Sequence, residues 1–279
     1  MTSSAQHPPT QPGQSAPLWR LLQATAAAVQ ATRQGQSLTA QLERVPQALR
    51  PGVQALSFQA LRQLGRATAL REQLAAKAPP LAADALLCTA LALCWNDADA
   101  PYPIHTLVNQ AVEAARQQRQ TQAQSGFINA CLRRFMRERE DLVLETDSDL
   151  QAQWNHPEWW VKRLQKDHPD HWQDILRANN QAAPMTWRVN TARISRDALQ
   201  NDWANHGLAS QPVGEQGLVL AQAQSVRDIP GFAEGLCSVQ DAAGQVVHDC
   251  GTGELVTLTR TDQFIELMLA GGSGYGDPR

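Results

Sequence analysis

Apolar residues recur at helical spacing through the first half of the chain. One series keeps the i, i+3, i+4, i+7 rule over Ile104, Leu107, Val108, Ala111, Val112 and Ala115. A second series has the same period over Phe127, Ile128, Cys131, Leu132, Phe135 and Met136. Both series predict amphipathic helices, which begin near residues 104 and 124.

Three more helices are predicted before residue 100. The segment 81–95 carries Asp84 as its one charge, which indicates a central helix that is buried on all sides. Prolines and a glycine punctuate the neighbouring pattern, so helices are also expected at 18–33 and 54–77. Together these elements predict an all-α domain over residues 18–142.

The composition changes past residue 140, because six of the eight tryptophans lie from Trp154 to Trp203. This density indicates a second core. Short helices are expected at 157–167 and 170–180, and the adjacent Trp159 and Trp160 are assigned to their apolar face.

A strand is predicted next, because Met185, Trp187 and Val189 alternate with polar residues. Residues 143–244 are therefore expected to form a small α+β module. An atypical Gly-rich tail over 245–279 follows, with strand-like stretches at 255–259 and 264–269. At the other end, residues 1–17 are rich in Ser, Gln, Pro and Thr, which predicts a disordered tail.

Composition places the chain among ordinary globular proteins. Its 279 residues are 43% apolar and 18% charged, without an apolar run long enough for a membrane helix and without a signal peptide. Five cysteines lack C-x-x-C spacing, and the seven histidines form no ligand pair at helical spacing. We expect a cytoplasmic protein with no metal site and no membrane partner.

Charge is distributed unevenly along the chain. Residues 1–140 carry 14 Lys and Arg against 8 Asp and Glu, whereas residues 141–279 carry 10 against 19. The basic half is nearly all arginine, which suits phosphate groups. On the helix near 124–140, Arg133, Arg134 and Arg137 fall opposite the apolar residues. This stripe is either a solvated helix face or a contact surface for RNA phosphates.

A second candidate for RNA contact lies on the predicted strand. Arg188 and Asn190 share one strand face, opposite Trp187 and Val189. The candidate RNA-binding residues are therefore Arg133, Arg134, Arg137, Arg188 and Asn190.

Several stretches carry a resemblance to a known family. The sequence QSGFINACLRRFMRERE at 124–140 and PIHTLVNQAVE at 103–113 resemble the antitermination-factor-like (NusB-like) domain of the bacterial 16S rRNA (cytosine-C5) methyltransferase B family. NHPEWW at 155–160, NNQAAPMT at 179–186 and RVN at 188–190 resemble the linker module of the same family, as do PGFAEG at 230–235 and SVQDAA at 238–243. The resemblance covers roughly residues 18–244.

The resemblance implies an RNA-binding helical domain, an α+β module and then a Rossmann-like domain that binds S-adenosylmethionine. This third domain is expected to be missing here, so the chain is expected to be truncated before it. The family adds a cysteine thiolate, in Pro-Cys and Thr-Cys-Ser contexts, to C6 of cytosine. None of the five cysteines here has such a context. We therefore expect no catalytic residue and no cofactor site.

Two features near the end of the chain bear on this expectation. Residues 246–253, VVHDCGTG, superficially resemble a cofactor-binding glycine loop, but only 26 residues follow, fewer than a nucleotide-binding unit requires. Residues 253–278 resemble the C-terminus of hydantoinase B or oxoprolinase proteins, over a length that cannot carry their chemistry.

Three functions stay open from the sequence. The first is the RNA-recognition portion of a 16S rRNA methyltransferase that binds a small-subunit rRNA hairpin but is catalytically incomplete. The second is a non-enzymatic NusB-like RNA-binding or transcription-regulating module. The third is a non-functional gene relic.

Overall fold

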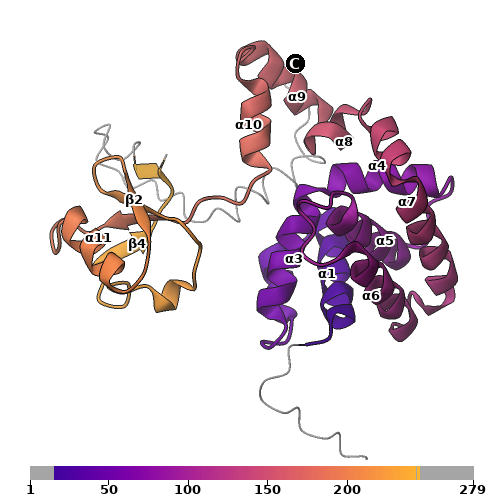
Figure 1. Ribbon diagram of the computed structural model, residues 1–279, viewed down its shortest axis with the longest axis horizontal. Helices are drawn as coiled ribbons and strands as arrows, with labels where there is room; N and C mark the ends of the chain where they lie inside the picture. The colour runs from indigo at the N-terminus through magenta and orange to yellow at the C-terminus, as the bar shows by residue number, and fades with distance from the viewer. Residues whose placement is uncertain (1–15, 243, 246–279) are drawn as a thin grey trace, which may run out of the picture. The chain divides into compact units, whose positions relative to one another are not determined.

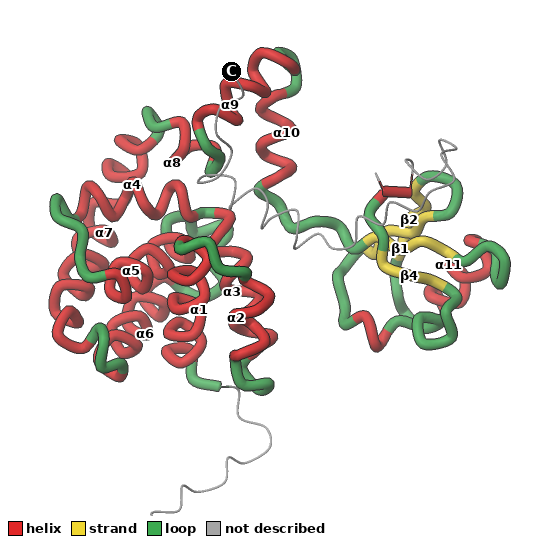
Figure 2. The backbone as a smooth tube through the Cα atoms, turned by 180° about the vertical axis from the view of Figure 1, so that it is seen from behind, coloured by secondary structure: helices red, strands yellow, loops and turns green. Residues whose placement is uncertain are grey.

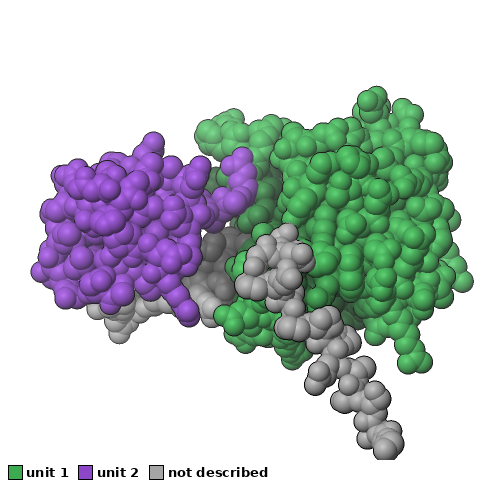
Figure 3. Space-filling view, turned by 60° about the horizontal axis from the view of Figure 1, so that its bottom comes forward, with its two compact units in different colours: residues 1–180 green, residues 181–279 purple. Residues whose placement is uncertain are grey.

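The computed structural model describes residues 16–242, 244 and 245, and it divides into two compact units. The first unit runs through Asn180, and the second begins at Gln181 (Figure 3). Described residues of the first unit form only helices and loops, whereas the second contains a four-stranded sheet (Figures 1 and 2). This confirms the expected fold class, an all-α domain followed by an α+β module.

Helices account for nearly all of the first unit. They are α1 (Leu18–Arg33), α2 (Leu38–Arg44), α3 (Arg50–Arg62), α4 (Leu64–Leu74), α5 (Leu81–Cys94), α6 (Ile104–Gln117), the 3₁₀ turn η1 (Gln122–Gln124), α7 (Ser125–Thr146), α8 (Leu150–Trp154), α9 (Glu158–Asp167) and α10 (Trp172–Asn179). Pro17, Pro80 and Pro103 directly precede α1, α5 and α6. Since proline favours an extended backbone in the residue before it and lacks an N–H, these positions fix where the helices begin.

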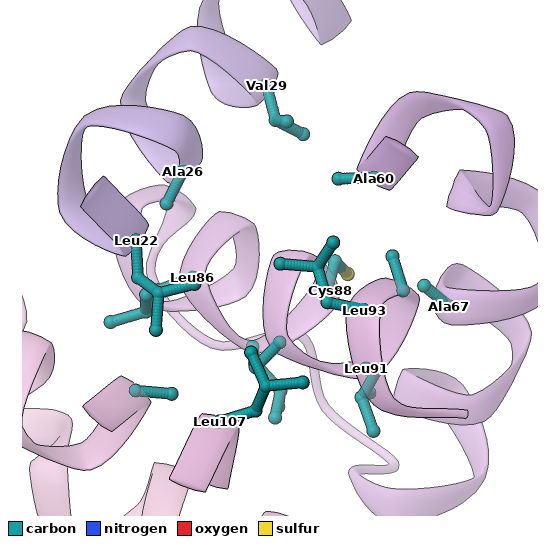
Figure 4. Packing of buried hydrophobic residues seen from close by; sticks show 14 of the residues in the cluster. Leu22, Ala26, Val29, Ala60, Ala67, Leu86, Cys88, Leu91, Leu93 and Leu107 are labelled. Carbon is teal, nitrogen blue, oxygen red and sulfur yellow. The ribbon is translucent and has the colours of Figure 1, made fainter. Parts of the chain in front are cut away.

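Helix α5 is the centre of this unit. Every residue from Ala83 to Cys94 is buried, as the low charge of the segment predicted. Side chains from α1, α3, α4 and α6 surround it, including Leu22, Ala60 and Leu107 (Figure 4). The apolar area that these helices remove from water is the main force that assembles the unit.

The single charge on α5 is buried and paired with two arginines, of which Arg71 is buried and Arg33 is exposed. Asp84 Oδ2 accepts a hydrogen bond from Arg33 Nη1 of α1 at 2.7 Å. Its Oδ1 lies 2.9 Å from Arg71 Nε of α4 in an ion pair. The side chains of Asp84 and Arg71 are 8% and 10% exposed, so neither charge is well hydrated. Each charge therefore depends on the other, and three helices are joined at one point.

The break between α3 and α4 corrects the sequence analysis, which predicted one helix over 54–77. Gln63 has φ −119° and ψ 11°, outside helical geometry. Asn155, which has a positive φ of 55°, fills the break. Its Oδ1 accepts from Gly65 N at 2.6 Å and its Nδ2 donates to Leu61 O at 3.1 Å. A side chain some 90 positions away thus satisfies the backbone groups that the break leaves free.

The first unit continues past residue 142, where the sequence analysis placed the start of the second domain. Arg66 of α4 is buried and donates to Val143 O, to Thr146 Oγ1 and to Asp147 Oδ1, at 3.2, 2.5 and 2.6 Å. These acceptors lie at the C-terminal end of α7, where a cation is favoured by the helix dipole. Arg66 therefore ties the end of α7 to the bundle.

Helices α8, α9 and α10 form a small cluster around Trp154, Val161, Leu164 and Leu176. Two side chains donate to the carbonyl oxygen of Trp154: His156 through Nδ1 at 2.6 Å and Asn180 through Nδ2 at 2.7 Å. Burial lowers the pKa of His156, which keeps its ring neutral near pH 7. The end of the first unit is thereby fixed to the end of α8.

The second unit is a sheet with one helix on it. Its elements are β1 (Thr186–Val189), α11 (Arg196–Asn205), β2 (Ser210–Val213), β3 (Gly217–Leu220), the 3₁₀ turn η2 (Val226–Asp228) and β4 (Cys237–Val239). The strand order is β2-β3-β1-β4, with every pair antiparallel. Trp187 lies opposite Leu218 and Val239, so β1 is central.

One face of this sheet carries the core. Trp187 and Val189 of β1 pack with Leu199 and Trp203 of α11, and the rings of Trp187 and Trp203 meet edge to face at 5.9 Å. Trp203 Nε1 donates to Pro230 O at 3.0 Å. Trp187 and Val189 are buried as the predicted alternation requires, whereas Met185 is only partly buried and Thr186 is buried as well. The stretches 255–259 and 264–269 lie outside the described residues.

We expect the Asp84→Ala variant to lower the free energy of unfolding by about 3 kcal/mol, because it leaves two arginines without their counter-charge. Urea unfolding followed by circular dichroism measures the loss. The control is Asp174→Ala, whose carboxylate is 75% exposed and pairs with Arg177. That surface pair contributes less than about 1 kcal/mol. Equal losses in the two variants would contradict a stabilising role for the contacts of Asp84 with Arg33 and Arg71.

We expect Gly65→Ala to release α8 from the bundle. A Cβ at Gly65 would lie 2.3 Å from the backbone oxygen of Gln151, so the backbone must move. Hydrogen exchange should then rise over residues 150–180 and stay low on α5. The control is Gly126→Ala on α7, where a Cβ meets nothing within 4 Å. Unchanged protection of 150–180 in the Gly65 variant would show that α8 is not held at this break.

Candidate nucleic-acid interface

The three arginines of the predicted stripe lie on the outer side of α7, away from the buried Leu132 and Phe135. They differ in their contacts. Arg133 is exposed, and its Nη2 donates to Asn109 Oδ1 of α6 at 2.7 Å. Arg134 is engaged twice, since its Nε pairs with Glu138 Oε2 at 2.8 Å and its Nη1 donates to Gln73 O at 3.3 Å.

Arg137 is the most available of the three. It is exposed, and among the described residues its side chain has no hydrogen-bond or ion-pair partner. It follows Arg133 by one helical turn, which places both guanidinium groups on one side of α7. Arg133 and Arg137 can therefore meet successive phosphates with little loss of internal contacts, whereas Arg134 cannot.

Helix α6 extends this basic surface, which the sequence analysis did not foresee. Asn109 contacts Arg133, and Arg116 is exposed seven residues further along the same helix. Residues seven apart share a helix face, so Arg116 adds a third cation. That Arg116 joins the surface of Arg133 and Arg137 follows from the packing of α6 on α7, which the sequence alone does not give. Arg139, by contrast, hydrogen-bonds to Asp97 and lowers the pKa of that carboxyl.

Arg188 and Asn190 belong to the second unit and have separate settings. Arg188, on β1, is half-buried on the sheet face opposite Trp187, where its Nε donates to Gln216 Oε1 at 3.2 Å and its Nη1 to Gln240 Oε1 at 3.4 Å. Asn190 lies one residue past the end of β1. Its Nδ2 donates to Gly235 O at 3.1 Å, so the amide holds a loop.

The assignment of Trp159 to the core was wrong, because its side chain is 59% exposed. Val161 and Leu164 define the buried side of α9. Trp159 precedes Val161 by two residues, or about 200° around the helix, and so points outward. Trp160 falls beside the buried side and packs partly against the cluster. Adjacent tryptophans on a helix thus have different environments.

The four cysteines within the described residues are all buried. Burial raises the pKa of Cys88 to about 11, of Cys94 to about 12 and of Cys237 to about 11, and it also raises that of Cys131. These groups are protonated thiols near pH 7, and a thiol is a poor nucleophile. Cys250 and the glycine loop at 246–253 lie outside the described residues.

A metal site needs clustered ligands and a membrane span needs a long apolar helix, and the described residues have neither. No group of three or more His, Cys, Asp and Glu side chains there could hold a metal ion. Over the same residues, no helix combines the length and apolar character that crossing a membrane requires.

Comparison with known families agrees with this architecture. The NusB family matches residues 19–137, and the ferredoxin-like domain of the RsmF/B-like methyltransferases matches residues 156–227. The second match begins within the first compact unit and includes α9, α10 and β1. The chain thus joins a NusB-type helical domain to the small domain of an RNA methyltransferase class.

Curated relatives narrow the class further. The chain is 37% identical over 219 residues to ribosomal RNA small subunit methyltransferase B of Pseudomonas putida. The aligned region covers 76% of this chain and 49% of that protein. The chain is 33% identical over 231 residues to the Vibrio cholerae protein of that name, covering 80% and 52%. Over the part it shares with them the chain is similar to the ribosomal RNA small subunit methyltransferase B proteins, and it spans about half their length.

A solved structure shares the fold. The crystal structure of PH0851 aligns with a TM-score of 0.56 at 15% identity, covering 89% of this chain and 61% of that one.

We expect the buried thiols to resist modification. In a Cys250→Ser variant, a disulfide reagent at about pH 8 should react with Cys88, Cys94 and Cys237 at least about a hundredfold more slowly than with a free thiol, because so little thiolate is present, and with Cys131 more slowly than with a free thiol. Denaturant should make all four react promptly. The release of the coloured thiolate measures both rates. A single cysteine that reacts at the free rate in the native chain would contradict the assignment of all four as thiols.

Proposed function

We propose that this chain recognises small-subunit ribosomal RNA as the RNA-binding portion of a cytosine-C5 methyltransferase. The observation that carries the proposal is the exposed arginine surface of α7 and α6, made of Arg133, Arg137 and Arg116, on a NusB-type domain. Arginine side chains with few internal contacts are ready to exchange water and counterions for phosphate oxygens.

The sheet of the second unit is the proposed second contact. Arg188 stands on the central strand, on the face that the core does not use, between two glutamine amides. Such a polar sheet face suits unpaired bases and phosphates. Asn190 would act by holding the loop beside it, through its hydrogen bond to Gly235 O. Arg134 would support the surface, since its own contacts are internal to the first unit.

The preferred target is an rRNA hairpin, met in the cytoplasm. A hairpin offers closely spaced phosphates in its stem to the arginines and unpaired bases in its loop to the second unit. The order of the two domains, NusB-type and then RsmF/B-type, supports a methyltransferase role over a free-standing transcription module. The buried thiols support recognition rather than methyl transfer by the described part of the chain.

We expect the double variant Arg133→Gln and Arg137→Gln to bind an rRNA hairpin more weakly and with less dependence on salt. For each phosphate that the variant no longer neutralises, the slope of log affinity against log salt becomes shallower by about 0.7 on single strands and about 0.9 on a duplex, so the two substitutions together should flatten it by about 1.4 to 1.8. Filter binding across a salt series measures the slope.

The matched control removes two exposed arginines elsewhere in the first unit, Arg20→Gln and Arg44→Gln. It keeps the net charge of the double variant. If the control makes the salt slope equally shallow, RNA binding depends on overall charge, and the α7 surface is not a specific contact site. If the wild-type chain binds no RNA, the proposed function is wrong.

A further inference from the structure

The outward side of α9 carries an aromatic ring among cations. At 100° per residue, Trp159, Lys162, Arg163 and Lys166 fall within an arc of about 100°, opposite Val161 and Leu164. All four are exposed. We call these four residues the Trp159 platform. The platform is separate from the arginine surface of α7 and α6 and from Arg188 on the sheet.

The indole of Trp159 is held in place. Trp160, which packs into the cluster of α8, α9 and α10, meets it edge to face at 5.6 Å and 70°. An indole that is 59% exposed on a fixed helix leaves a large apolar area in water. A flat partner that covers one face of this ring gains that area at small cost in side-chain freedom.

The cations beside the ring can be used by a partner. Lys162 pairs with Glu158 at 2.7 Å and Arg163 pairs with Asp167, both as exposed pairs along the helix. Such pairs contribute little and exchange readily. Lys166 has no hydrogen-bond or ion-pair partner among the residues described. The platform therefore combines a stacking ring with phosphate-binding groups within one or two helical turns.

A second exposed apolar residue of this unit has the opposite surroundings. Leu144 is 70% exposed on α7, and Glu140, Asp141 and Asp147 lie within one turn of it. Those carboxylates would repel RNA. The charge around Trp159 thus favours a polyanion, and the ring favours a base.

We propose that Trp159 stacks on an unpaired base of bound RNA, while Arg163 and Lys166 contact the adjoining phosphates. The proposal rests on the proposed function and adds a contact within the first unit that reads unpaired nucleotides. Base stacking tolerates any sequence, so the platform selects single-stranded over paired RNA rather than one base over another.

The test uses the full chain with Trp159→Phe and Trp159→Ala, and with Leu144→Ala as the control. The probes are a single-stranded RNA of about a dozen nucleotides, roughly the site size of stacking proteins, and a blunt duplex of the same composition. The alanine variant should bind the single strand about fivefold to a hundredfold more weakly and the duplex unchanged. The phenylalanine variant should keep most of the affinity and lose the quenching of tryptophan fluorescence that stacking causes. Leu144→Ala should match the wild type.

Three outcomes overturn the platform. The first is that the wild-type chain binds the single strand and Trp159→Ala binds it equally well. The platform is then wrong, and the proposed function still holds. An equal loss on both probes shows a structural effect. Protection of Trp159 from acrylamide in the free chain shows that protein, not RNA, covers the ring. Absence of RNA binding by the wild-type chain is the separate failure of the proposed function.

Discussion

The helical unit depends on the pairing of one buried carboxylate, that of Asp84, with two arginines. Asp84 is the only charged residue of α5, it is buried, and Arg33 and Arg71 supply its counter-charges. Apolar burial brings α1, α4 and α5 together without specifying how far each is rotated. The paired charges do specify it, because the contacts form only in one arrangement of the three helices.

The surfaces that face solvent follow from that arrangement. Once α5 is surrounded, α6 and α7 can bury only one side each, and the arginines fall on the other. Two more polar contacts, Arg66 with the end of α7 and Asn155 with the break before α4, hold helices α8 to α10 against the bundle. The exposed Trp159 is thus presented from a supported element rather than from a loose connection.

The local pattern of apolar and polar residues was sufficient to predict much of this fold. Helices at 18–33, 81–95 and 104–115 could be located because their apolar period and their prolines agree. The break at Gln63 could not be foreseen, since the side chain that satisfies its backbone groups, Asn155, lies far along the chain. Strand β1 could be located from an apolar–polar alternation over residues 185–189, and β2, β3 and β4 lack an alternation of that length. Among the candidate site residues, the arginine face was readable, but the internal contacts of Arg134 and the loop role of Asn190 depend on tertiary neighbours.

The hydrogen bond from Asn180 to Trp154 O limits how far apart the two proposed RNA contacts can lie. It fixes the point at which the chain leaves the helices, and β1 begins only six residues later, at Thr186. Five intervening residues reach at most about 20 Å. An RNA held by either unit is therefore presented to the other at an effective concentration on the order of millimolar. Under the proposed function, each unit needs to bind RNA only modestly, and the short tether supplies avidity only for an RNA whose two contact points lie close enough to be spanned.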